Sequence, residues 1–294
     1  MAHAAAALPA RARAREARLV GWVRRHPLLS LVALIYLFEW AVLIPGAADA
    51  RGLLPFHGPV ANVVGLLAGW GPGLAAVIVL GLTEGRGAVV ALLRRYLIWR
   101  VNVGWYLLAL FGTAAFILGG IGLHVLLGGT APTLPIASAS PLSAVLVFLV
   151  TVAFGFVVNT EDLAWRGVAL PRLQAARGAL GASLVIGVLE GLTHLPYFFI
   201  PGDFRQQVGF VWFMAFTIAI VIVLTWMFNS TGGSVLLVTL YHASQNAWAN
   251  LLDTTPAPGP NDLRPFILAV VLMIVTAAVV AAIYGPARLA RRRA

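Results

Sequence analysis

Eight apolar stretches limit what this chain can fold into. The 294-residue sequence is 61% hydrophobic and only 10% charged, whereas a soluble domain carries roughly a quarter charged residues. Each stretch approaches or exceeds the ~20 residues that a helix needs to cross a bilayer, and open β structure would leave backbone groups unbonded there. We therefore predict an all-α polytopic membrane protein, with about eight transmembrane helices enclosing an intramembrane polar cavity. The expected spans are Leu28–Ala47, 59–83, 104–127, 141–170, 180–200, 208–229, 233–252 and 265–285.

The arginines predict how these helices are oriented. If the N-terminus is cytoplasmic, seventeen of the 20 basic residues, all arginine, fall in cytoplasmic segments. The other three, Arg51, Arg205 and Arg264, fall in outer segments. Cytoplasmic loops of membrane proteins are enriched in basic residues. We therefore expect a multi-pass protein of the cell (plasma) membrane, with both termini in the cytoplasm. The bilayer accounts for the positive charge, so no nucleic-acid partner is expected.

The first apolar stretch has two interpretations. Ala48-Asp49-Ala50 resembles a signal-peptide cleavage site, which would remove Leu28–Ala47. The long basic segment before it, the length of the apolar run and the interruption at Glu39 favour a retained helix.

A cluster of charges inside the apolar sequence marks the candidate site. No charge occurs from Pro141 to Val158, and then Glu161, Asp162 and Arg166 follow closely. Ionisable residues within membrane helices are functional candidates, because burying them is costly. Asp162 and Arg166 are four residues apart and can form an ion pair on one helix face. This would leave Glu161 free to face a cavity, where a carboxylate can act as a general base.

Histidines in two later spans complete the polar set. His194 and His242 are expected at a depth similar to that of Glu161, judging from the helical rise of about 1.5 Å per residue. Asn246 lies one turn after His242, and Glu190 lies one turn before His194. A lone membrane histidine is often only a hydrogen-bonded core residue, and Glu190 either contacts His194 or faces a neighbouring helix. We interpret three other residues as structural or interfacial: Glu39, Glu84 and His124.

Three motifs occur in order: Glu161-Asp162-x-x-x-Arg166, Glu190-Gly191-Leu192-Thr193-His194 and His242-Ala243-Ser244-Gln245-Asn246. In order and spacing they resemble the E-E-x-x-x-R, F-x-x-x-H and H-x-x-x-N signatures of the CAAX-protease and bacteriocin-processing (CPBP) family of intramembrane endopeptidases. The resemblance covers about residues 141–252. Two positions depart from the family pattern, with Asp162 in place of a second glutamate and Glu190 in place of the usual aromatic residue.

This resemblance implies hydrolysis of a peptide bond in a membrane cavity open to the cytoplasm. Glu161 would activate water and His194 would hold or polarise it. His242 and Asn246 would stabilise the oxyanion, and Asp162 and Arg166 would support the site. The expected partner is a peptide or membrane-protein substrate; whether it is prenylated, and the oligomeric state, stay open.

The resemblance leaves the cofactor open. Zinc or another divalent metal could be held by Glu161, His194 and His242, but the same residues also suit a metal-free mechanism. Two other functions remain as alternatives: a non-proteolytic relative with the same fold, acting as an immunity factor or chaperone, and a proton-coupled transporter that uses Glu161 as a relay. The absence of a detectable duplicated half weighs against the transporter.

The expected organisation has four parts. Residues 1–27 form a basic cytoplasmic arm, and 28–140 contain the first three transmembrane helices. Residues 141–252 form the CPBP-like catalytic core with helices four to seven, and 253–294 contain the last helix and a basic tail.

Overall fold

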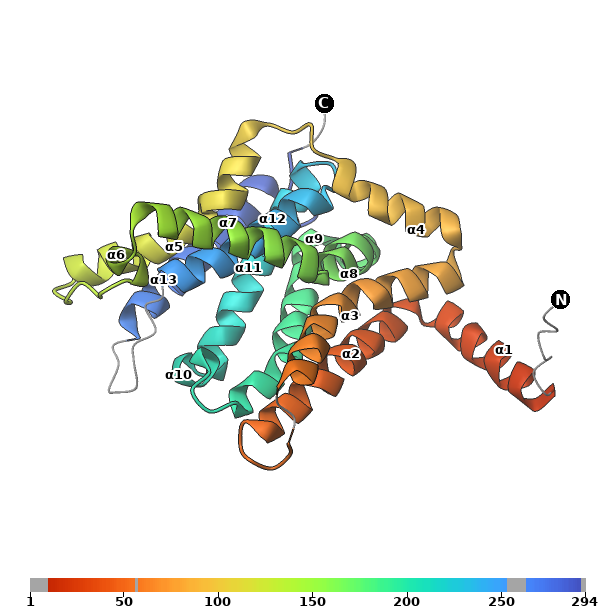
Figure 1. Cartoon of the computed structure of the whole chain (residues 1–294). Helices are drawn as coiled ribbons and strands as arrows, with labels where there is room; N and C mark the ends of the chain where they lie inside the picture. Colours follow the sequence, from red (N-terminus) through yellow and green to blue (C-terminus); the bar gives the residue numbers. More distant parts are fainter. Residues whose placement is uncertain (1–9, 56–57, 253–262, 292–294) are drawn as a thin grey trace.

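The computed structural model describes residues 10–55, 58–252 and 263–291, and in these ranges it contains helices and no strand (Figure 1). The α-helices before the predicted core are α1 (Ala10–Arg25), α2 (Pro27–Asp49), α3 (Pro59–Thr83), α4 (Arg86–Leu93), α5 (Val103–Leu126) and α6 (Pro135–Ser138). Those that follow are α7 (Pro141–Val158), α8 (Glu161–Ala164), α9 (Leu170–Thr193), α10 (Phe204–Val208), α11 (Phe210–Ser230), α12 (Val235–Leu251) and α13 (Arg264–Tyr284). Two 3₁₀ turns, η1 (Arg94–Leu97) and η3 (Leu195–Phe199), and a π-helical turn, η2 (Trp165–Ala169), lie between them.

The predicted class of an all-α polytopic membrane protein is confirmed. Seven helical segments in the described residues are long and apolar enough to cross a membrane. The predicted span 233–252 corresponds to α12, which has 17 residues and carries the polar residues of the third motif. Many large apolar side chains face outward, and α7 is the extreme case, with only 6% of its span buried. An outward apolar surface of this kind suits contact with lipid.

Local sequence signals explain where several helices begin. The Ser140 side chain accepts a hydrogen bond from the Ser143 amide, and Pro141 occupies the first turn of α7. Ser234 caps α12 in the same way by accepting from the Leu237 amide. Each cap satisfies one of the amides that a helix start leaves unbonded.

The prediction of one helix over 141–170 is wrong, because α7 ends at Val158. Thr160 turns away from the helical path and binds α3, where its amide and its hydroxyl both donate to the Gly69 carbonyl, at 3.1 and 2.8 Å. The Gly73 amide donates to the Thr160 hydroxyl at 2.9 Å. A Cβ on residue 73 would lie 2.7 Å from Thr160, so this close approach requires glycine. The break places Glu161 at the start of a new helical segment.

The segment from Glu161 to Thr193 folds back on itself at Gly178. Gly178 has φ 68° and ψ 170°, a conformation that is essentially restricted to glycine. The two arms of this hairpin, Glu161–177 and 179–Thr193, have nearly equal length. At about 1.5 Å per residue, both open ends lie roughly 25 Å from the turn. The predicted span 180–200 also ends early, at Thr193, and Pro196 lies in the 3₁₀ turn that follows.

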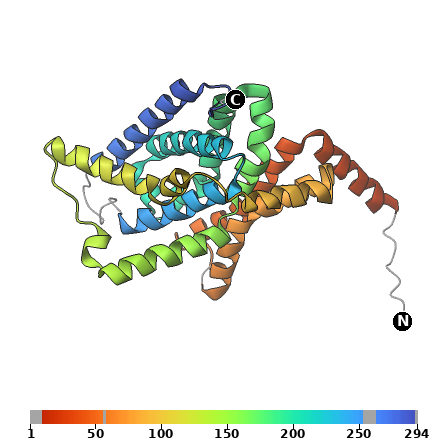
Figure 2. The same ribbon diagram turned by 90° about the horizontal axis from the view of Figure 1, so that it is seen from above.

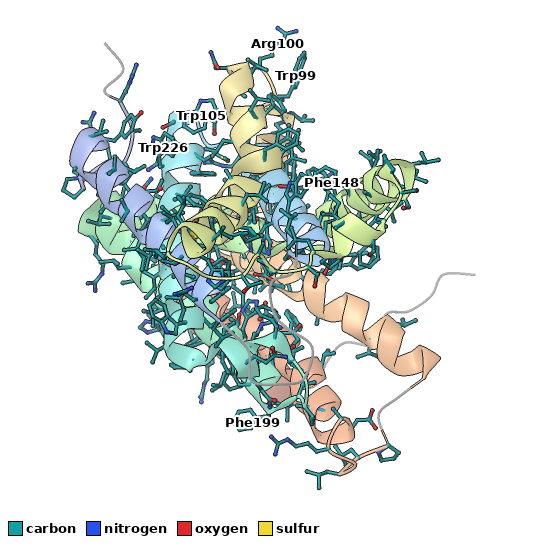
Figure 3. The ribbon with its side chains drawn as sticks, turned by 90° about the vertical axis from the view of Figure 1, so that its left-hand side faces the viewer. Trp99, Arg100, Trp105, Phe148, Phe199 and Trp226 are labelled. Atoms are coloured by element: carbon teal, nitrogen blue, oxygen red, sulfur yellow. The ribbon has the colours of Figure 1, made fainter. Side chains whose placement is uncertain are left out.

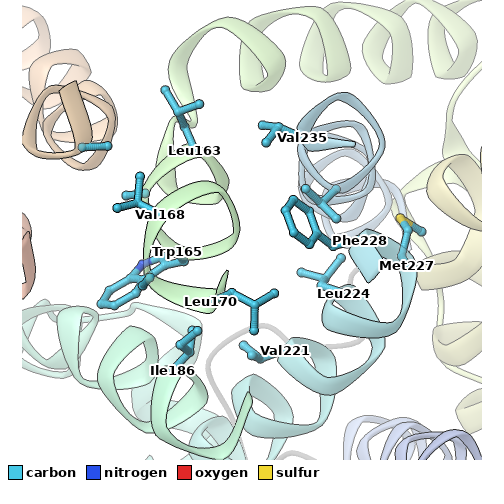
Figure 4. Close-up of a cluster of buried hydrophobic side chains, with 14 of the residues drawn as sticks. Leu163, Trp165, Val168, Leu170, Ile186, Val221, Leu224, Met227, Phe228 and Val235 are labelled. Atoms are coloured by element: carbon cyan, nitrogen blue, oxygen red, sulfur yellow. The ribbon is translucent and has the colours of Figure 1, made fainter. Parts of the chain in front are cut away.

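A buried apolar cluster holds the hairpin against the helices beside it. Leu163, Trp165 and Leu170 come from the first arm, and Ile186 comes from the second. All four belong to one buried cluster with Val221, Leu224 and Phe228 of α11, and Figure 4 shows Leu170 beside Leu224 and Val221. This packing fixes the first arm between α3 and α11. Figure 2 gives the same bundle from above, with α1 extending away from it.

Candidate active site

Arg166 is the centre of a buried charge network. Its Nη1 lies 3.2 Å from Asp162 Oδ1 and 2.8 Å from both carboxylate oxygens of Glu190, which belongs to the second arm of the hairpin. Arg166 is 1% exposed and Asp162 is 0% exposed. The expected Asp162–Arg166 ion pair is therefore present. The cytoplasmic placement of Arg166 used in counting arginines is wrong, because its guanidinium lies inside the bundle.

The structure places the Glu190 carboxylate on Arg166, so it does not bind the His194 ring. Of the two interpretations of Glu190, the one in which it faces a neighbouring element is correct. His194 instead contacts the backbone of Glu190, with its Nδ1 3.0 Å from the Glu190 carbonyl oxygen. A carbonyl can only accept, so Nδ1 carries a proton, and in the neutral ring Nε2 keeps its lone pair. The ring packs against Phe213, with centroids 5.5 Å apart.

Asp162 also orients the second histidine. Its Oδ2 lies 3.3 Å from Nδ1 of His242 on α12. Because a carboxylate accepts this hydrogen bond, His242 carries a proton on Nδ1, and Nε2 is the ring nitrogen that Asp162 does not bind. Asn246 follows one helical turn later on the same face of α12. Asp162 thus links the arginine network to the third motif.

A cavity of about 490 Å³ joins the three motifs. Its lining includes Glu161, Glu190, His194, His242 and Asn246. Glu161 Oε2 is buried and has no hydrogen-bond partner among the described residues. Asp162 and Arg166 do not line the cavity and lie behind it. The site therefore presents one carboxylate outside the Arg166 ion pairs, two imidazoles and one amide to a common space.

Glu39, interpreted from the sequence as structural or interfacial, is a neighbour of the site. This residue of α2 is 6% exposed, and its carboxylate lies beside the Thr193 hydroxyl in a region that also contains Glu161 and Glu190. Two donors from α2 attach it to the end of α9: Tyr36 Oη to the Leu189 carbonyl (2.7 Å) and Trp40 Nε1 to the Thr193 carbonyl (2.9 Å). The sequence signal for this role was that Glu39 is the one acidic residue within the first apolar span, Leu28–Ala47.

The residues do not form a ready metal centre. Within the described ranges, no group of three or more histidine, aspartate and glutamate side chains is arranged to hold a metal ion. Glu161, His194 and His242 share the cavity without forming such a group. We therefore derive no chemical step through a metal.

The fold and the site together define a multi-pass membrane protein with a polar cavity of carboxylate and imidazole groups within its helical bundle. Comparison with known proteins adds a family. Residues 138–248 match the family model described as type II CAAX prenyl endopeptidase Rce1-like. This match confirms the resemblance seen in the three motifs, over less than half of the chain. No curated protein matches the sequence.

Proposed function

We propose that the protein is an intramembrane endopeptidase in which Glu161 activates the attacking water. The observation that carries this proposal is the buried Oε2 of Glu161, which lacks a hydrogen-bond partner among the described residues, in a cavity shared with His194, His242 and Asn246. The family match over 138–248 supports the same reaction class.

The proposed mechanism uses only these side chains. Glu161 takes a proton from water while the water oxygen bonds to the peptide carbonyl carbon, with the Nε2 lone pair of His194 holding the second water proton. The oxyanion accepts hydrogen bonds from the Asn246 amide and from His242, provided that the His242 ring carries a proton on Nε2 as well. Glu161 then returns its proton to the amide nitrogen as the C–N bond breaks. Asp162 orients His242, and Arg166 holds Asp162 in place.

Glu161→Gln tests the proposal, because it keeps the size of the side chain and removes the base. With membrane proteins of the native host as substrates, we expect proteolysis to fall by about 10²–10⁴-fold. The thermal stability of the variant itself should be unchanged. Glu84→Gln is the matched control, since Glu84 pairs with Arg172 away from the cavity. Normal turnover by Glu161→Gln would exclude the proposed role.

Treatment with a chelator tests separately whether the reaction needs a metal. We propose that the reaction needs no metal, so the purified protein should keep its activity after extensive treatment with EDTA. Loss of activity that added zinc restores would establish a metal requirement instead.

A further inference from the structure

The cavity has a closed floor and an exposed end. At the floor, Thr113, Leu224 and Met273 are only 3–5% exposed. At the other end, Ala249 and Asn250 are exposed, and Phe204 is 38% exposed. Exposure rises along the lining face of α12, from half-buried His242 and Asn246 to Ala249 and Asn250. In the described part of the chain, the mouth of the cavity is therefore at the C-terminal end of α12.

The mouth lies at one defined end of the bundle. It is lined by α10, by the last turn of α12 and by the first turn of α13. The connection after α2 reaches the same end, because Arg51 Nε donates to the Phe199 carbonyl at 2.6 Å. In Figure 1 both α10 and the connection after α2 lie toward the bottom, and Figure 3 shows Phe199 at the lower end of the bundle.

Most arginines described outside the site gather at the opposite end. Their partners are carbonyls and side chains at this opposite end of the bundle. Three such contacts are Arg24 Nε to the Leu82 carbonyl at 2.9 Å, Arg95 Nη1 to the Gly233 carbonyl at 3.3 Å, and the Arg172–Glu84 ion pair. The Arg288 carbonyl accepts from Asn229 Nδ2 at 2.7 Å, which brings the C-terminal segment to this end as well. Figure 3 shows Arg100 at the upper end, far from Phe199.

The hairpin gives the depth of the site relative to these two ends. Its turn at Gly178 lies at the arginine-rich end, because the Ala179 and Leu180 amides donate to the Ala287 and Pro286 carbonyls. Glu161 and His194 lie roughly 25 Å along the arms from this turn. The hydrocarbon core is only ~30 Å thick, so the site is nearer to the end that carries the mouth.

We propose that the substrate is a peptide segment that enters the cavity from the non-cytoplasmic face of the membrane. Basic residues mark the cytoplasmic side, so the floor faces the cytoplasm and the mouth faces the opposite side. Gln245, Asn246 and Asn250 line the route from the mouth and offer donors and acceptors to an extended backbone. The inference rests on the proposed protease function. It differs from the cytoplasmic opening that the family resemblance implies.

Cysteine labelling tests the orientation of the mouth, because the wild-type chain contains no cysteine. Three single variants are compared in right-side-out membrane vesicles: Ala249→Cys at the mouth, Ser138→Cys in α6 at the same end, and Gly87→Cys in α4 at the arginine-rich end. All three positions are exposed. A membrane-impermeant maleimide should label the first two in intact vesicles and Gly87→Cys only after permeabilisation.

Two outcomes would overturn the proposal. Labelling of Gly87→Cys alone in intact vesicles would mean that the mouth faces the cytoplasm. Labelling of Ser138→Cys without Ala249→Cys would mean that the cavity is closed on that face. If Ala249→Cys does not accumulate, Asn250→Cys reports on the same exposed turn.

Blocking the mouth tests the entry of substrate separately. External maleimide should abolish proteolysis by Ala249→Cys and leave the cysteine-free wild type unaffected. Continued cleavage by the fully labelled variant would show that substrate enters elsewhere, and the inference would be wrong. If the wild type cleaves nothing, the proposed function fails, while the labelling pattern still establishes which face the cavity opens to.

Discussion

At the scale of single residues, the site depends on one cation between two buried carboxylates. Arg166 pairs with Asp162 and Glu190, and Asp162 in turn orients His242. Spacing along one helix predicted Asp162 as a partner of Arg166. It could not predict Glu190, which belongs to the second motif. Glu190 therefore belongs to the buried ion-pair network of Arg166, and it contacts His194 through its backbone carbonyl.

Replacing Arg166 should destabilise the fold strongly. Arg166→Gln leaves Asp162 and Glu190 buried without their cation, and removing one partner of a buried ion pair costs about 3–5 kcal/mol. Arg172→Gln is the control, since the Arg172–Glu84 pair is partly exposed and such pairs contribute about 0–1 kcal/mol. The measurement is thermal unfolding of the purified protein in one detergent. Equal unfolding midpoints for the two variants would show that the buried network does not stabilise the fold.

At the scale of elements, hydropathy located most helices within a few residues, because lipid selects long apolar segments regardless of their partners. It did not locate the break after Val158, whereas the turn at Gly178 falls within the predicted connection between the spans 141–170 and 180–200. The break after Val158 depends on Thr160 reaching Gly69 and Gly73 of α3, and that contact is between distant parts of the chain. The turn at Gly178 depends on the C-terminal segment, whose carbonyls at Pro286 and Ala287 accept from the second arm.

Gly178 should be hard to replace. An alanine there must adopt a conformation that costs about 1–3 kcal/mol for residues other than glycine, and its Cβ would lie 3.3 Å from Ala287 Cα. Gly178→Ala is therefore expected to lower the midpoint of thermal unfolding. Gly122→Ala, in a helical part of α5 with nothing within 4 Å of the added carbon, should leave the midpoint unchanged or raise it slightly. A midpoint for Gly178→Ala that equals that of Gly122→Ala would refute this account of the turn.

At the scale of the whole molecule, the three motifs lie within residues 141–252, and helices of the N-terminal part contact both ends of the hairpin that carries two of them. α3 holds the start of the first arm through Thr160, and α2 binds the end of the second arm through Tyr36 and Trp40. Most of the described arginines outside the site gather at the end of the bundle opposite the mouth of the cavity. Their cytoplasmic placement stays a prediction from the sequence, whereas the position of the mouth required the structure.

The position of α2 leads to the last prediction, that this helix stays attached in the mature protein. Removing it would leave the Leu189 and Thr193 carbonyls without these donors and would uncover the region around Glu39 and Thr193. Inside a bilayer no water replaces these donors, so a chain that loses α2 should not keep a stable site. The intact mass of protein purified from native-host membranes should therefore include the residues before Arg51. The control is Ala50→Leu, which removes the small residue expected at a cleavage site and should change the mass only by the substitution. A wild-type chain that begins at Arg51, together with a full-length Ala50→Leu chain, would instead establish that Leu28–Ala47 is a cleaved signal sequence.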